Sequence, residues 1–203
     1  MALSTVLREL QSVEDVSAQI GKSVTIFGSA RIDQDQPTYR LALQVAHGLA
    51  SSGYSVISGG GPGIMRAAAQ GARAAGGCAV GFNISLPFER LDVSLQDVSL
   101  TFDNFFTRKL AFARCSHGFV AMPGGMGTLD ELFDILTLIQ TKKLTPRPIA
   151  LVDSDFWGGL LDWMRQQLVA RGLVSVEEVD AIGVFDSPEQ VLSFLESEGV
   201  NER

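Results

Sequence analysis

The chain has 203 residues, of which 46% are hydrophobic and 19% are charged. This length and balance suit a single globular domain with a full hydrophobic core and exclude an intrinsically disordered chain. No apolar run reaches the roughly eighteen residues of a membrane-spanning helix, and the N-terminal segment lacks the apolar core of a signal peptide, so we expect neither a membrane partner nor a leader.

The net charge of −7 is concentrated near the C-terminus, because residues 150–203 hold eleven acidic and three basic residues. No cluster of lysine and arginine offers a basic face, which argues against a nucleic-acid partner. The two cysteines, Cys78 and Cys115, form no CxxC pair, so we exclude a disulfide framework and expect free thiols in the cytoplasm. His47 and His117 are far apart in sequence, so no histidine-rich metal site is expected.

Hydrophobic patterns and glycine and proline positions predict alternating helices and strands. In chain order, the predicted elements are a helix over residues 4–20, a strand over 24–27, a helix over 38–51, a strand over 54–58, a helix over 64–75, strands over 78–82 and 98–102, a helix over 105–115, a strand over 118–121, a helix over 128–140, a strand over 148–152, a helix over 156–170, a strand over 182–185 and a helix over 188–198. Residues 83–97 have the least regular pattern and could lie over a ligand site.

This order of elements predicts a Rossmann-like α/β fold, in which a doubly wound parallel sheet forms the middle of three α/β/α layers. No linker divides the chain, so residues 1–203 are expected to form one nucleotide-binding domain. Residues 1–21 and 171–203 are expected to be flanking helical segments.

Two glycine-rich segments each follow a predicted strand and open a predicted helix. They are residues 58–65 (SGGGPGIM) and residues 122–131 (MPGGMGTLDE). Glycines let a ligand approach the backbone, and the free N–H groups of a helix start form an anion site. Both segments should lie at the carboxyl ends of the strands, where doubly wound sheets bind ligands. The alternative is that the glycines only form tight turns.

Neither segment is a standard nucleotide-binding fingerprint. The pattern GxGxxG lacks its last glycine in both, because Ile64 and Asp130 stand there. The Gly-Lys-Ser sequence at residues 21–23 lacks the first glycine of a P-loop, since Val16 occupies that position. ATP hydrolysis and hydride transfer are therefore disfavoured.

The second segment also carries a hydroxyl and two acids. Thr128 is well placed to meet a phosphate oxygen, and Asp130 and Glu131 are expected in the first turn of the helix. Acids in a first turn can be simple caps that the helix dipole favours. The alternative is catalytic, because a carboxylate repels phosphate but suits a sugar that develops positive charge.

Arg108 lies on the predicted helix that precedes the second segment. Helical spacing groups Phe106, Leu110 and Ala113 into an apolar stripe that we expect to face the core, with Arg108 on the opposite side. Arg108 is then either a ligand for phosphate or ribose or a solvated surface arginine.

Together these segments resemble the Lonely Guy (LOG) family of cytokinin riboside 5′-monophosphate phosphoribohydrolases, whose bacterial branch is often labelled "possible lysine decarboxylase". Residues 123–131 (PGGMGTLDE) match the family signature PGGxGTxxE, and residues 59–65 are similar to its first glycine motif. Residues 27–31 (FGSAR), residues 86–90 (LPFER) and the pair Arg108 and Lys109 resemble further family segments. The resemblance runs from about residue 22 to residue 170.

The resemblance implies a homodimer that hydrolyses the N-glycosidic bond of a nucleoside 5′-monophosphate, such as AMP or a cytokinin ribotide, to a free base and ribose 5-phosphate. It implies catalytic roles for Glu131 and Arg108, and we expect no cofactor and no metal. The residues expected to bind substrate or phosphate are Gly28, Ser29, Gly60, Gly61, Gly63, Glu89, Lys109, Gly124, Gly125, Gly127, Thr128 and Asp130. The helix over residues 128–140, apolar nearly all round, also favours a dimer.

The expected reaction fits Glu131 on chemical grounds as well. Cleavage of a C1′–N bond builds an oxocarbenium-like ribose, which a carboxylate can stabilise while it activates water. The sequence shows no obvious second carboxylate for this site. The general acid for the leaving base and the identity of that base therefore stay open.

Two other classes of protein remain as alternatives. A pyridoxal phosphate-dependent decarboxylase requires a Schiff-base lysine, and of the four lysines only Lys109 adjoins the predicted site. A non-catalytic carrier of a nucleotide or of the molybdenum cofactor would use similar glycine loops. Such a carrier has no need of Glu131 and Arg108 beside its anion site.

Overall fold

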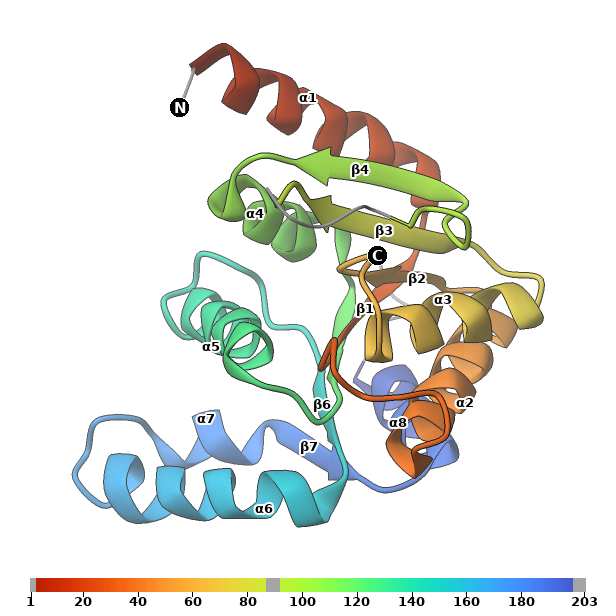
Figure 1. Cartoon of the computed structure of the whole chain (residues 1–203). Helices are drawn as coiled ribbons and strands as arrows, with labels where there is room; N and C mark the ends of the chain where they lie inside the picture. Colours follow the sequence, from red (N-terminus) through yellow and green to blue (C-terminus); the bar gives the residue numbers. More distant parts are fainter. Residues whose placement is uncertain (1–2, 87–91, 199–203) are drawn as a thin grey trace.

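The computed structural model describes residues 3–86 and 92–198, which form a parallel sheet between two layers of helices (Figure 1). Seven strands pair in the order β4-β3-β2-β1-β5-β6-β7, and every pairing is parallel. The strands are β1 (Ser23–Phe27), β2 (Ser55–Ser58), β3 (Ala79–Ile84), β4 (Val98–Phe102), β5 (Gly118–Ala121), β6 (Ile149–Val152) and β7 (Ile182–Phe185). All seven correspond to predicted strands, which confirms the doubly wound α/β fold.

The helices divide between the two faces of the sheet (Figure 1). One face is covered by α2 (Pro37–Ser51), α3 (Ile64–Ala74) and α8 (Pro188–Ser197). The other is covered by α1 (Leu3–Ile20), α4 (Phe105–Cys115), α5 (Met126–Gln140) and α6 (Ser154–Trp163). A π-helical turn (η1, Met164–Val169) continues α6, and the short helix α7 (Val176–Asp180) follows it.

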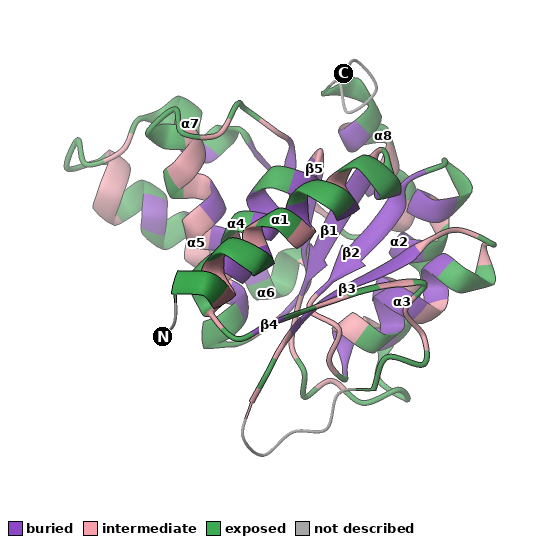
Figure 2. Ribbon diagram, turned by 90° about the horizontal axis from the view of Figure 1, so that it is seen from above, coloured by how far each residue is buried: buried purple, intermediate pink, exposed green. Residues whose placement is uncertain are grey.

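Burial on both faces explains why the central strands β1, β2, β5 and β6 are short apolar runs. Every residue of β1 is buried, as expected for a parallel strand with helices on each side. Val24 and Ile26 pack toward α2 and α3, whereas Phe27 packs against the rings of Phe112 and Phe119 on the other face. Figure 2 shows the buried residues gathered in the sheet and on the inner sides of the helices.

Besides shifts of one or two residues at other element ends, three features differ from the predictions. Helix α5 begins at Met126 and not at Thr128, because Gly125 is its N-cap and a first turn tolerates glycine. The predicted helix over residues 156–170 is α-helical only as far as Trp163. Helix α7 was not predicted, although its capping box of Ser175 and Glu178 is a sequence signal for a helix start.

The strand order places the glycine-rich segments together. The chain runs outward from β1 to β4 and then returns to lay β5 beside β1. Phe27 pairs with Ala121, so these two strands end at the same level. Ligands of doubly wound sheets bind at such a reversal of strand order. Within residues 3–86 and 92–198, none of the helices has the length and apolar character to cross a membrane.

Candidate active site

The loops that follow β1 and β5 are joined by backbone hydrogen bonds. The N–H of Ser29 donates to the carbonyl of Pro123 at 3.1 Å, and the carbonyl of Ser29 accepts from the N–H of Ile64 at 3.0 Å. Gly28 packs so tightly on Ile64 that a Cβ there would overlap its side chain. Gly28 and Ser29, both expected to bind substrate, therefore hold the two glycine loops in place.

The first glycine loop connects β2 to α3. Gly60 and Gly63 have φ angles of 74° and 64°, which favour glycine. A Cβ at Gly60 would overlap Asn83, and one at Gly63 would overlap the backbone of Ser29. Gly63 is the N-cap of α3, and no side chain among the described residues caps this helix. Apart from the N–H of Ile64, which donates to Ser29, the N–H groups of its first turn are thus available to an anion.

The second glycine loop connects β5 to α5. Gly124 lies against Thr128, whose side chain a Cβ at Gly124 would overlap. A Cβ at Gly125 or Gly127 would have no described atom within 4 Å, so the space beside these residues is open to a ligand. Helix α5 also lacks a side-chain cap in the part of the chain that is described. Both loops therefore present helix N-termini at the junction of β1 and β5.

Arg108 lies between the first loop and α5 and is buried, with 8% of its surface exposed. Its Nε donates to the carbonyl of Phe82 at 2.7 Å, and its Nη2 donates to the carbonyl of Gly59 at 3.4 Å. Its guanidinium lies 5.2 Å from the centroid of the Phe112 ring, within cation–π range. A guanidinium has further N–H groups in the same plane, which can meet a ligand.

Glu131 approaches this arginine from α5. Its Oε1 lies 3.4 Å from Nη1 of Arg108, and its side chain is 17% exposed. Burial raises the pKa of Glu131 to about 7, although the charge of Arg108 opposes the rise. A carboxyl group that titrates near neutrality beside a buried arginine is typical of catalytic sites.

The position of Glu131 along α5 argues against simple capping. Helix α5 begins at Met126, so Asp130 and Glu131 lie in its second turn. The prediction that they lie in the first turn is therefore wrong. The helix dipole acts mainly on the first turn. The capping explanation therefore has little support.

The predicted orientation of α4 is also wrong for most of its apolar stripe, of which only Ala113 is buried. Phe106 and Leu110 are 50% and 39% exposed, whereas Arg108 and Phe112 are buried. Phe112 packs against the rings of Phe27 and Phe82, which draws this side of the helix toward the sheet. Arg108 is drawn in with it, because carbonyl groups and Glu131 satisfy its donors. The interpretation of Arg108 as a solvated arginine is therefore excluded.

Lys109 and Asp130 form an ion pair beside this cluster. The Nζ of Lys109 lies 2.7 Å from Oδ1 of Asp130 and 3.9 Å from Oδ1 of Asp134. The side chain of Asp130 is 56% exposed. These two predicted binding residues thus face a shallow cleft that Met126 and Leu129 also line. Glu89 lies outside the described residues.

Two amide side chains near the first loop were missed in the sequence. The Nε2 of Gln96 donates to the carbonyl of Gly60 at 3.3 Å and to Oδ1 of Asn83 at 2.9 Å. The Nδ2 of Asn83 in turn donates to Ser99 and to the carbonyl of Leu100, each at 3.0 Å. Asn83 was assigned to the irregular segment after the predicted strand over residues 78–82, but it lies in β3 and is buried, where its polar side chain needs partners.

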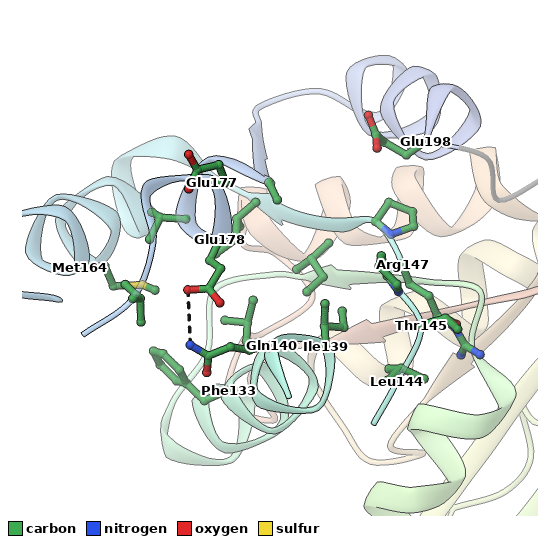
Figure 3. Close-up of a pocket in the computed structure, with 18 of the residues that line it drawn as sticks. Phe133, Ile139, Gln140, Leu144, Thr145, Arg147, Met164, Glu177, Glu178 and Glu198 are labelled. Atoms are coloured by element: carbon green, nitrogen blue, oxygen red, sulfur yellow. Dashed lines mark hydrogen bonds between the residues drawn. The ribbon is translucent and has the colours of Figure 1, made fainter. Parts of the chain in front are cut away.

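A cavity of about 830 Å³ lies elsewhere, near the amino ends of β6 and β7 (Figure 3). Phe133 and Ile139 of α5 and Met164 of η1 line it, and the amide of Gln140 donates to Glu178 at 3.4 Å to join α5 to α7. None of the predicted site residues lines this cavity. Among residues 3–86 and 92–198, no group of three or more His, Cys, Asp and Glu could hold a metal ion.

The sheet, the two open helix N-termini and the buried Arg108–Glu131 pair define a Rossmann-like protein with a candidate phosphate-binding and acid–base site. The model of the family described as "Possible lysine decarboxylase" matches residues 65–195. The chain belongs to this family, and the expected Lonely Guy membership is confirmed.

Named relatives agree with this assignment, and a solved structure has a similar fold. The chain is 35% identical over 159 residues to a cytokinin riboside 5′-monophosphate phosphoribohydrolase of Mycobacterium tuberculosis, covering 75% of this chain and 82% of that protein. It is 29% identical over 189 residues to a phosphoribohydrolase of the same name, LOG2, of Arabidopsis thaliana, covering 91% and 86%. The fold resembles the molybdenum cofactor binding protein of Rippkaea orientalis, with a TM-score of 0.62, 22% identity and coverage of 87% and 96%.

Proposed function

We propose that this chain hydrolyses the N-glycosidic bond of a nucleoside 5′-monophosphate, to a free base and ribose 5-phosphate. The observation that carries the proposal is the buried pair of Arg108 and Glu131, beside two helix N-termini that suit a phosphate. Relatives named as phosphoribohydrolases support the same class of reaction.

The reaction needs a negative group near C1′ and a separate site for the phosphate. The backbone N–H groups around Gly124–Thr128 and at the start of α3 bind the phosphate. Glu131 then faces the ribose, where its ionised form stabilises the positive charge that develops and orients the attacking water. Arg108 holds the Glu131 carboxylate in place and donates its remaining N–H groups to the substrate.

We propose AMP and N6-substituted adenosine monophosphates as substrates. A panel of nucleoside monophosphates, with detection of free base and ribose 5-phosphate, tests this and ranks the bases. Release of ribose 5-phosphate over many turnovers supports the proposed hydrolase function. Tight binding of a nucleotide without turnover supports the second candidate, a non-catalytic carrier, which the similar fold of the molybdenum cofactor binding protein favours.

A decarboxylase with pyridoxal phosphate fits the site less well. The amine of Lys109 forms ion pairs with Asp130 and Asp134. A Schiff base with the cofactor would require Lys109 to give up both contacts. Incubation with pyridoxal phosphate should therefore produce no absorbance of a bound internal aldimine.

Replacement of Arg108 by alanine is expected to lower kcat/KM by about ten- to a hundredfold, because a charge-assisted hydrogen bond contributes about 1.5–3 kcal/mol. Steady-state kinetics with AMP measure the effect. Arg114→Ala is the matched control, since Arg114 lies on the same helix and forms an exposed ion pair with Glu14. If kcat/KM is unchanged in Arg108→Ala, Arg108 has no part in the reaction.

We also propose a homodimer or a larger even-numbered oligomer. Large apolar side chains are exposed on α4 and at the first residue of α5, namely Phe105, Phe106, Leu110 and Met126. We propose that they form one interaction surface, because contiguous exposed apolar side chains mark such surfaces. On α5, only Thr128, Leu132 and Ile135 are buried within one chain.

Sedimentation at micromolar concentration should give an even-numbered oligomer. Leu110→Glu should weaken it, because a charge would be buried in the interface, whereas Leu173→Glu, at an exposed residue of the turn before α7, should leave it intact. A monomeric wild-type protein would rule out this proposal.

We propose a cytoplasmic location. Cys78 and Cys115 are both free thiols. Burial raises the pKa of Cys115 to about 11 and also raises the pKa of Cys78, so both thiols stay protonated and unreactive. Free thiols suit a reducing compartment. Fractionation of the native host with detection of the protein tests this location.

A further inference from the structure

A carboxylate from the N-terminal helix lies at the start of the helix that carries Arg108. Glu9 of α1 is 6% exposed. One of its oxygens accepts from the N–H of Asp103 at 2.7 Å, and the other accepts from Nδ2 of Asn104 at 3.2 Å and from the hydroxyl of Thr107. Three donors around the first turn of α4 therefore converge on one buried carboxylate.

Helix α4 has no acidic residue of its own in the first turn, and the side chain of its N-cap, Asn104, accepts no hydrogen bond from the helix. An anion at a helix N-terminus is favourable because it meets the positive end of the dipole. Glu9 supplies that anion from a helix more than ninety residues earlier in the chain. Burial raises the pKa of Glu9, but its hydrogen bonds lower the pKa by more, so Glu9 is ionised at neutral pH.

The contact lies one residue from the catalytic arginine. Thr107 is fully buried and binds Glu9, and Arg108 follows it directly and points toward the sheet. A helix whose first turn is fixed by a buried carboxylate holds its next side chain in a narrow range of positions. Arg108 in turn lies 3.4 Å from the carboxylate of Glu131.

We propose that Glu9 is a positioning residue for the reaction, which sets the place of Arg108 against Glu131 by anchoring the first turn of α4. This inference rests on the proposed function for its kinetic consequence only. The structural consequence, a change in the environment of Glu131, is measured without substrate.

The test compares Glu9→Ala and Glu9→Gln with Glu14→Gln. Glu14 is the matched control, because it also lies on α1 and also contacts α4, but through an exposed pair with Arg114 at the other end of that helix. Glu9→Gln retains the size of the side chain and stays informative if the alanine variant does not fold. Melting temperatures establish which variants are folded.

The first readout is the titration of the Glu131 carboxyl, followed by carbon-13 NMR in the free protein. Arg108 lowers the pKa of Glu131, so displacement of Arg108 should move the midpoint above the wild-type value. Both Glu9 variants should show this rise and faster amide hydrogen exchange over residues 103–108. Glu14→Gln should show neither. A general loss of stability alone would not move the midpoint.

The second readout is the rate with AMP. Glu9→Ala should lower kcat by about tenfold with little change in KM, as expected when one charge-assisted contact that orients a catalytic group is lost. An unchanged Glu131 titration in folded Glu9 variants would overturn the proposal. A shifted titration in a protein without hydrolase activity would retain the positioning role and reject the proposed function instead.

Discussion

Replacement of Glu131 by glutamine should lower kcat by at least about a hundredfold and leave nucleotide binding nearly unchanged. The amide keeps the size of the side chain but can neither stabilise an oxocarbenium-like ribose nor accept a proton from water, and loss of such a group costs about two orders of magnitude or more. Rapid-quench kinetics with AMP and equilibrium binding of AMP measure the two effects.

Folding should tolerate this change. The pKa of Glu131 is raised in the folded chain, so folding favours its neutral form. The contribution of this neutral form to the free energy of unfolding is present at acidic pH and is lost as the pH rises through about 7. A neutral glutamine should therefore melt no lower than the wild type at pH 8. Asp134→Asn on the same helix is the control and should retain activity.

The wild-type pH profile follows from the same assignment. If ionised Glu131 is the active form, kcat/KM should rise with pH through an apparent pKa of about 7. Glutamine at this position should remove that limb. A Glu131→Gln variant with more than about a tenth of the wild-type kcat would contradict the catalytic role.

Nucleoside monophosphates should exceed the matching nucleosides and triphosphates by at least about a hundredfold in kcat/KM. A nucleoside leaves the backbone donors of both glycine loops without their partner, and each unmet polar group costs about 1–3 kcal/mol. Phosphate binding also orients the glycosidic bond, so its loss should lower kcat as well as raise KM.

The triphosphate should be poor for a different reason. The sequence has no P-loop to hold a longer phosphate chain. Rates with AMP, adenosine and ATP under one set of conditions test the preference for the monophosphate. Inhibition by added ribose 5-phosphate tests the subsite for the sugar and the phosphate. Equal rates with adenosine would show that the glycine loops bind no phosphate.

Local sequence signals predicted much of the fold and of the candidate site. Strands such as residues 24–27 and 118–121 are short apolar runs with a glycine or proline within two residues of their ends, and burial on both faces requires such apolar runs. Glycine loops are equally local, because positive φ at Gly60 and Gly63 requires glycine. Strand order then brought the two loops together.

Other features depend on contacts between distant residues and carry little local signal. The inward orientation of Arg108 follows from the packing of Phe112 on Phe27 and Phe82, which helical periodicity could not reveal. Glu9 shares α1 with Glu14 and Asp15, and only its contacts with residues 103–107, more than ninety residues away, distinguish it. Gln96 lies in the irregular segment and reaches Gly60 only in the folded chain.

The most direct test of the central claim is a product balance with AMP in the presence of wild-type protein and of the Glu131→Gln variant. We expect the wild type to release adenine and ribose 5-phosphate in equal amounts over many turnovers, and the variant to bind AMP but release almost none of either. Adenosine with inorganic phosphate as products, or stoichiometric binding of AMP without turnover by the wild type, would contradict the account.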